Sequence, residues 1–285
     1  MAVKFQTLNP NAPIFRELEK EPSWWKRFKN DSSLYIEVRK DNQVNVYFEG
    51  GSIARIHYSG KHKQLQIFTH HKYLDKPAPS KKSPYIECSS FIEDVVDKNY
   101  PDYHVYDKII ERVKSCYSRK KAHNEEFPKE KWSEKYIQGT LIARSREFHL
   151  DSEFAYKDGE SDNRIDLIRY DNGKITFVEL KRIDDNRMLH QTDETPEVVF
   201  QMQRYKKFIE KYSDELLAYY QKVYDIKQML GLPVPHSKPM SINKEAELLI
   251  FDGWVKNTKR RTEHRSRLYQ ILKNKSVKYY VKTEL

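Results

Sequence analysis

The sequence predicts an α/β protein in which a mixed-sheet domain follows a smaller, β-rich N-terminal domain. Four segments between residues 34 and 70 alternate apolar and polar side chains, which is the period of half-buried strands. After residue 131, helical and strand-like segments alternate, as they do in α/β layers. The apolar fraction of 38% leaves enough side chains for a core in a chain of 285 residues. We therefore expect two domains, 1–120 and 121–285, with a charged connection at 119–131.

The N-terminal domain is expected to be a β-meander with helices after it. Three prolines before residue 31 indicate an irregular arm with about one helical turn. Short turns at Asp41-Asn42, Gly50-Gly51 and Gly60-Lys61 separate the strands, and a Pro- and Lys-rich loop covers 70–84. The expected strands are 34–40, 43–49, 52–58 and 65–70, and the expected helices are 89–100 and 102–121.

The second domain is expected to run helix, three strands, helices, strand, helix and strand. The pattern "RIDLIRYDNGKITFVELKR" predicts a β-hairpin, because two apolar runs flank an Asn-Gly turn. Ser133 is a plausible N-cap for the first helix, and Gly231 ends the last helix before Pro233. The expected helices are 133–148, 196–212, 213–231 and 258–274, and the expected strands are 148–156, 164–171, 174–182, 246–255 and 276–282.

Charge and composition restrict the function classes. The net charge is +10, and ten Lys or Arg against one acid lie between Lys256 and Lys282. Such an excess suits a polyanion such as nucleic acid, or it forms a solvated helix face. No apolar run is long enough for a membrane span, and the N-terminal residues do not resemble a signal peptide. Cys88 and Cys116 are isolated, so we expect no disulfide framework or zinc site, and a cytoplasmic protein without a membrane partner.

The predicted hairpin carries charge where a buried strand should not. Glu179 and Lys181 are two residues apart and share one face of their strand, and Asp166 lies on the antiparallel neighbour. Two carboxylates facing each other would repel, unless a cation lies between them. Mg²⁺ accepts one or two carboxylates together with water and phosphate oxygens. Without further context, a solvated strand edge is the commoner explanation for such residues.

The context favours the metal site, because the spacing resembles the PD-(D/E)XK nuclease superfamily. Asp166 followed by Glu179-Leu180-Lys181 resembles its core motif, and the resemblance covers about residues 131–255. Ile165 stands where the family motif has proline. The resemblance implies a restriction-endonuclease-like αβββαβ core and Mg²⁺ as cofactor, with Mn²⁺ as a substitute. It implies that Asp166, Glu179 and the backbone carbonyl of Leu180 bind the metal, and that Lys181 assists the attacking water.

Three further features extend the resemblance. Glu134, at the start of a helix, matches the family's additional metal-facing acid; Glu147 and Glu153 are the alternatives. Gln201 and Tyr205 share a helix face and resemble the Gln-x-x-x-Tyr element that is thought to contact DNA. Tyr205 has a structural alternative as a core residue. Further expected nucleic-acid contacts are Arg182, Lys259, Arg260, Arg261 and Arg265.

The sequence therefore predicts a metal-dependent nuclease that hydrolyses phosphodiester bonds, with DNA as the expected substrate. By analogy with the family, it would act in restriction or anti-phage defence. A homodimer would supply two active sites for the two strands of a duplex. The alternatives are a nuclease acting on RNA and a non-catalytic nucleic-acid-binding protein.

Overall fold

A computed structural model describes residues 7–74, 76–80, 83–88, 105–118, 128–159, 161–189 and 194–285. The chain divides into two compact units that are discontinuous in sequence. The first comprises Met1–Glu126, Lys135–Arg146 and Lys222–Val234, and the second comprises Phe127–Glu134, Glu147–Gln221 and Pro235–Leu285. The helix expected at 89–100 and residues 119–127 of the expected connection lie outside the described residues.

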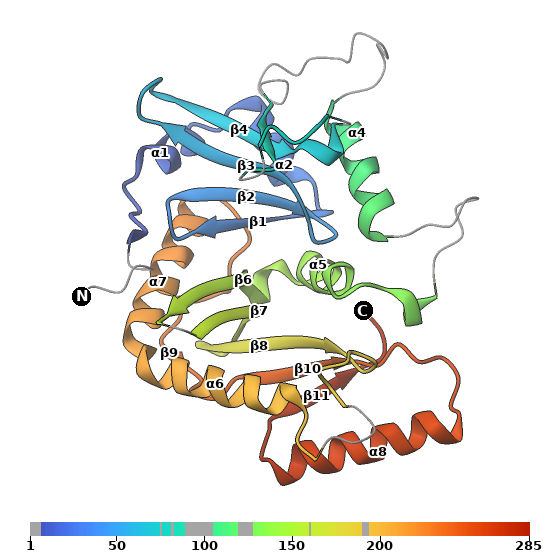
Figure 1. The fold of residues 1–285 in the computed structure, drawn as a ribbon. Helices are drawn as coiled ribbons and strands as arrows, with labels where there is room; N and C mark the ends of the chain where they lie inside the picture. Colours follow the sequence, from blue (N-terminus) through green and yellow to red (C-terminus); the bar gives the residue numbers. More distant parts are fainter. Residues whose placement is uncertain are drawn as a thin grey trace. The chain divides into compact units, whose positions relative to one another are not determined.

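The first unit contains a five-stranded antiparallel sheet in the order β1-β2-β3-β4-β5 (Figure 1). The predicted meander is confirmed, because each expected strand matches one of the first four. Its strands are β1 (Leu34–Arg39), β2 (Gln43–Phe48), β3 (Gly51–Ser59), β4 (Gln64–His70) and β5 (Tyr85–Glu87). Its helices are α1 (Pro13–Glu19), α2 (Ser23–Asn30) and α4 (Val105–Val113), and α5 (Glu134–Arg144) and α7 (Ser213–Met229) contribute residues to both units.

One local prediction for this unit is wrong, and one strand was not predicted. The N-terminal arm forms α1 and α2 rather than one irregular turn. Proline begins the first helix at Pro13 and precedes the second at Pro22, and both helices have buried apolar side chains. β5 follows the expected Pro-rich loop directly and adds to the edge of β4, and the sequence did not predict this strand.

Two glycines allow a close approach between a β-turn and a helix in the first unit. Gly50 has a φ of +82°, and a Cβ there would lie 2.3 Å from the carbonyl oxygen of Lys135. A Cβ on Gly139 would lie 2.2 Å from the backbone nitrogen of Gly50. Both positions therefore require glycine for the turn between β2 and β3 to meet α5.

The second unit contains a six-stranded mixed sheet in the order β11-β10-β8-β7-β6, with β9 pairing with β8 (Figure 1). Neighbours β6, β7 and β8 are antiparallel, whereas β9 and β10 pair with β8, and β11 with β10, in parallel. The predicted α/β class is confirmed, and β9 is an addition that the sequence did not predict. The strands are β6 (His149–Asp158), β7 (Ser161–Asp171), β8 (Lys174–Arg182), β9 (Ser241–Ile242), β10 (Glu247–Phe251) and β11 (Tyr279–Lys282).

The remaining helices of this unit are α6 (Glu197–Lys211) and α8 (Lys259–Asn274). Short 3-10 turns occur at His71–Tyr73, Lys129–Lys131 and Arg146–Phe148, and a π-type turn at Lys114–Ser118. Among the described residues, no helix combines the length and the apolar character that crossing a membrane requires.

The predicted hairpin is confirmed as β7 and β8, paired from Leu167 opposite Val178 to Asp171 opposite Lys174. Asn172 and Gly173 have φ values of +47° and +80°, the left-handed conformation that an Asn-Gly hairpin turn requires. Extending this register places Asp166 opposite Glu179. Most of β8 is buried on both faces, so the charges of Glu179 and Lys181 lie inside the protein.

Candidate active site

The three charged side chains of the hairpin meet inside the second unit. The ammonium of Lys181 donates a short hydrogen bond to Glu179 and a 2.8 Å hydrogen bond to the carbonyl oxygen of Leu180. It lies 3.7 Å from Oδ2 of Asp166. The side chains of Glu179 and Lys181 are each 2% exposed, while that of Asp166 is 30% exposed. Asp166 therefore connects a buried charge cluster to solvent.

Helix α6 supplies two polar groups to the same cluster. Gln201 donates a hydrogen bond of 2.6 Å from Nε2 to Oε1 of Glu179, and Tyr205 donates from its hydroxyl to Oε2 at 3.1 Å. Nε2 of Gln201 also donates to the Tyr205 hydroxyl at 2.8 Å. The Tyr205 hydroxyl lies in hydrogen-bonding distance of the Arg164 carbonyl oxygen as well, so its single proton serves one acceptor at a time. The predicted proximity of Gln201 and Tyr205 is thus present, and both are buried.

Glu134 lies near this cluster and belongs to a second group of charges. Its Oε2 is 3.6 Å from Nη2 of Arg187, and its side chain interacts with Asp185. Arg187 holds Asp185 through two side-chain hydrogen bonds of 2.6 and 2.8 Å. The charge of Lys181 lowers the pKa of Glu134, and the charge of Asp166 raises it. Sequence reasoning missed Asp185 and Arg187; the signal was the charged turn "RIDDNR" directly after the motif.

The buried Glu179 and the half-buried Glu134 both resist ionisation. Burial, followed by the negative charge of Asp166, raises the pKa of Glu179 to about 7. Burial, together with the nearby carboxyls of Asp185 and Asp166, raises the pKa of Glu134 to about 7 against the opposing charge of Lys181. Burial alone would lower the pKa of Lys181, but the negative charges of Glu179, Asp166 and Glu134 raise it. The cluster therefore holds more potential negative charge than Lys181 neutralises.

This imbalance predicts how stability depends on pH without metal ions. A carboxyl with a folded pKa of about 7 and a reference value of 4.5 binds its proton more tightly in the folded state. The contribution of each such carboxyl to the free energy of unfolding is then greatest below pH 4.5. It falls by about 1.4 kcal/mol per pH unit as the pH rises to about 7. Urea unfolding in EDTA at pH 5, 6 and 7 should show this slope, and Glu179→Gln should lack the contribution of Glu179. A constant difference between parent and Glu179→Gln from pH 5 to 7 would contradict the prediction.

The alternative acids occupy different positions. Glu147 is exposed in the turn after α5. Glu153 has a φ of +51° and lies in β6 between Ser152, which pairs with Leu167, and Phe154, which pairs with Ile165. This register places Glu153 across from Asp166. Glu134 and Glu153 are therefore both candidates for the additional acid.

The basic residues expected to contact nucleic acid fall into two groups. Arg182 binds the carbonyl oxygens of Glu130 and Trp132 and both carboxylate oxygens of Asp184. Arg261 pairs with Glu130 at 2.9 Å, and Arg265 pairs with Asp252. All three guanidinium groups are therefore engaged in hydrogen bonds or ion pairs within the protein. Lys259 and Arg260 are exposed at the start of α8.

The oxygens around Lys181 also fit a divalent cation. The ammonium occupies the space to which Asp166, Glu179 and the Leu180 carbonyl direct oxygen atoms, and these are the donor types that Mg²⁺ prefers. In addition, the buried Oε1 of Glu134 has no hydrogen-bond partner. Within the described part of the chain, however, no three His, Cys, Asp or Glu side chains group as metal ligands. A Mg²⁺ site here would therefore combine two carboxylates with the backbone carbonyl, water and substrate oxygens.

Comparisons with protein-family models, curated proteins and solved structures find no match for this chain.

Proposed function

We propose that the protein is a metal-dependent nuclease of the PD-(D/E)XK type that hydrolyses phosphodiester bonds of DNA. The observation that carries this proposal is the convergence of Asp166, Glu179, the Leu180 carbonyl and Lys181 at one point. Burying the Glu179 carboxylate and the Lys181 ammonium requires a large desolvation free energy, which is difficult to explain as a stability device. The order α5, β6, β7, β8, α6 and β10, with α7 and β9 inserted before β10, also supports the αβββαβ arrangement of that superfamily.

Each residue has a defined role in the proposed reaction. Asp166, Glu179 and the Leu180 carbonyl would hold Mg²⁺, which when bound supplies a water of lowered pKa and compensates charge on the phosphate. Lys181 would orient the attacking water and stabilise the negative charge that develops on the phosphoryl oxygens. Gln201 and Tyr205 hold Glu179 in its orientation through hydrogen bonds of 2.6 and 3.1 Å. Asp166, being the most exposed of the three charged residues, would meet the substrate first.

The experiment that tests the proposal is a digestion panel. Purified protein is incubated with single- and double-stranded DNA and RNA, with Mg²⁺, with Mn²⁺ or with EDTA. We expect cleavage of DNA with either metal and none in EDTA. If only RNA is cleaved, the substrate of the proposed nuclease is RNA instead of DNA.

One observation favours the non-catalytic alternative. Lys181 already neutralises part of the negative charge on Glu179 and Asp166, so these ion pairs could stabilise the cluster without a metal. That alternative predicts nucleic-acid binding that persists in EDTA, together with no cleavage of any substrate in Mg²⁺ or Mn²⁺. This combination of results would reject the nuclease.

A further inference from the structure

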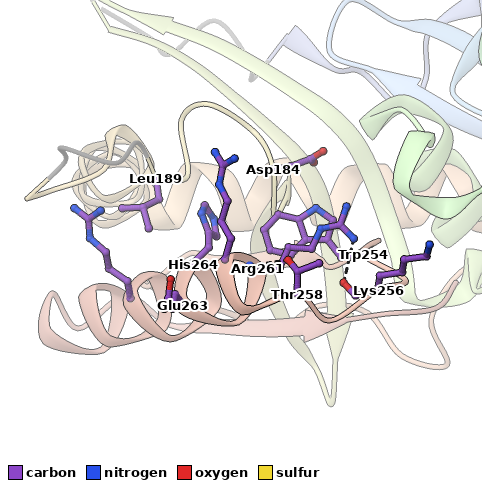
Figure 2. A pocket seen from close by; sticks show the side chains of 10 residues that line it. Asp184, Leu189, Trp254, Lys256, Thr258, Arg261, Glu263 and His264 are labelled. Carbon is purple, nitrogen blue, oxygen red and sulfur yellow. Dashed lines mark hydrogen bonds between the residues drawn. The ribbon is translucent and has the colours of Figure 1, made fainter.

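The second unit also contains a concave site that none of the residues of the charge cluster lines. A pocket of about 800 Å³ lies between the N-terminal half of α8 and the loop that follows β8. Figure 2 shows Asp184 and Leu189 on one side, with Thr258, Arg261, Glu263 and His264 of the α8 region facing them. The remaining lining residues are Trp254, Lys256, Arg260 and Arg267. Its volume lies in the range of small-ligand sites.

The cationic side chains of the pocket differ in their availability. Arg261 is bound to Glu130, and the acid Asp184 is bound by Arg182. Lys256 and Arg260 are exposed, and no ion pair within the described residues involves either. The pocket thus offers two available cations at its rim, where a phosphate would bind.

The inner wall has a different character. Trp254 is half-buried and packs edge-on against His264 with a ring separation of 5.2 Å, and Leu189 adds an apolar surface. Arg261 and Arg265 lie over the Trp254 ring at 5.3 and 5.1 Å and hold it in place. Burial lowers the pKa of His264, so the ring is neutral at pH 7 and adds a flat surface. A flat wall beside cations suits a nucleobase joined to a phosphate.

The pocket is also close to the proposed site of hydrolysis. Asp184 follows Lys181 by three residues, so their Cα atoms lie within about 11 Å. At the rise of about 3.4 Å per nucleotide that one strand has in stacked DNA, this distance corresponds to about three nucleotides, and to fewer in an extended strand. A strand that is cut at Lys181 can therefore reach the pocket. A base paired inside a duplex cannot reach its inner wall, because the base is stacked between its neighbours.

We propose that this pocket receives an unpaired nucleotide of the substrate strand, with the phosphate at Lys256 and Arg260 and the base against Trp254, His264 and Leu189. The inference deepens the proposed function and rests on it, since the strand it binds is the strand that is cut. It assigns the substrate as DNA that is single-stranded beside the cleaved bond. A free nucleotide has the same chemistry, so the experiment compares both sources.

The test is DNA binding in EDTA, measured by fluorescence anisotropy with a labelled 12-nucleotide single strand, its blunt duplex and an abasic strand of equal length. Lys256→Gln/Arg260→Gln should weaken binding of the single strand at least about tenfold. It should also reduce the slope of log K against log salt by about 0.7, since the contact to one phosphate is lost. The control pair Lys273→Gln/Lys275→Gln removes the same charge from the exposed C-terminal end of α8, outside the pocket, and should change binding less than twofold.

The duplex and the abasic strand should bind the parent more weakly than the intact single strand, and dTMP should compete only weakly because it has one phosphate. Equal losses for both variant pairs would overturn the proposal, as would failure to bind the single strand or equally tight binding of the duplex. Binding of dTMP as tight as that of the oligonucleotide would assign the pocket to a free nucleotide instead. If binding depends on Lys256 and Arg260 but no metal supports cleavage, the proposed nuclease function is rejected, while the assignment of the pocket as a nucleotide site is retained. If DNA is cleaved but both variant pairs bind the single strand equally well, the assignment of the pocket as a nucleotide site is rejected, while the nuclease function is retained.

Discussion

Replacing Lys181 by alanine is expected to abolish detectable DNA cleavage, a loss of at least about 10³-fold, while DNA binding stays within about twofold. The ammonium is 2% exposed and lies between Glu179 and the Leu180 carbonyl, and alanine leaves no positively charged side chain at this position. In the proposed reaction it stabilises charge that forms only in the transition state. Its loss should therefore reduce kcat and leave the affinity for DNA nearly unchanged.

Metal binding separates this role from a purely structural one. Because the Lys181 ammonium competes with a cation for the same oxygens, Lys181→Ala should be stabilised by Mn²⁺ at least as much as the parent. Glu179→Gln removes one of those oxygens and should lose most of that stabilisation. The measurement is the change in Tm between EDTA and Mn²⁺ for the parent and both variants.

Lys206→Ala is a suitable control, because Lys206 lies on α6 and forms an exposed ion pair with Glu245 at 3.1 Å. Exposed pairs of this kind contribute little to stability, so both Tm and cleavage should stay close to the parent values. If Lys181→Ala cuts DNA as fast as the parent, Lys181 has no catalytic role. If Mn²⁺ stabilises neither the parent nor Lys181→Ala, the cluster does not bind a metal.

The hairpin and its charged face could be predicted because both depend on local sequence. The alternation of side chains fixes which residues share a face, and Asn172-Gly173 fixes the turn and hence the register. The helix position of Gln201 and Tyr205 also follows from a spacing of four. These short-range rules were sufficient to bring Asp166, Glu179 and Lys181 together. The expectation that α6 lies beside them came only from the resemblance to the nuclease superfamily.

Other features depend on contacts between segments far apart in sequence. Arg261 and Arg265 belong to a basic helix, which suggested contact with nucleic acid, but Glu130 and Asp252 bind them. Nothing near these arginines in the sequence identifies their partners. The pocket beside Trp254 is equally non-local, because it combines the loop after β8 with residues 254–267.

A buried ion pair in the first unit is a further case, because its two residues are 190 positions apart. Lys227 of α7 donates a hydrogen bond of 3.0 Å to Oε2 of Glu37 on β1, and their side chains are 4% and 1% exposed. The helical spacing of α7 does not determine whether Lys227 faces the core or solvent. The alternation of side chains in β1 would equally allow Glu37 to face solvent. Only the tertiary structure brings the two charges together.

Lys227→Ala is expected to lower the free energy of unfolding by about 3–5 kcal/mol, since it leaves the buried carboxylate of Glu37 without its counter-ion. Urea unfolding followed by far-UV circular dichroism measures this loss. Lys20→Ala serves as the control, because Lys20 forms an exposed ion pair with Glu17 and its removal should change stability by less than about 1 kcal/mol.

The double variant Glu37→Leu/Lys227→Leu distinguishes an unpaired charge from lost packing. Replacing both members of a buried pair with apolar side chains removes the desolvation penalty together with the attraction, so such changes are often neutral or stabilising. The double variant should therefore be clearly more stable than Lys227→Ala, although it carries more substitutions. If it is as unstable as Lys227→Ala, the loss reflects packing of the lysine stem rather than the charge of Glu37, and the pair has no special electrostatic role in holding α7 to β1.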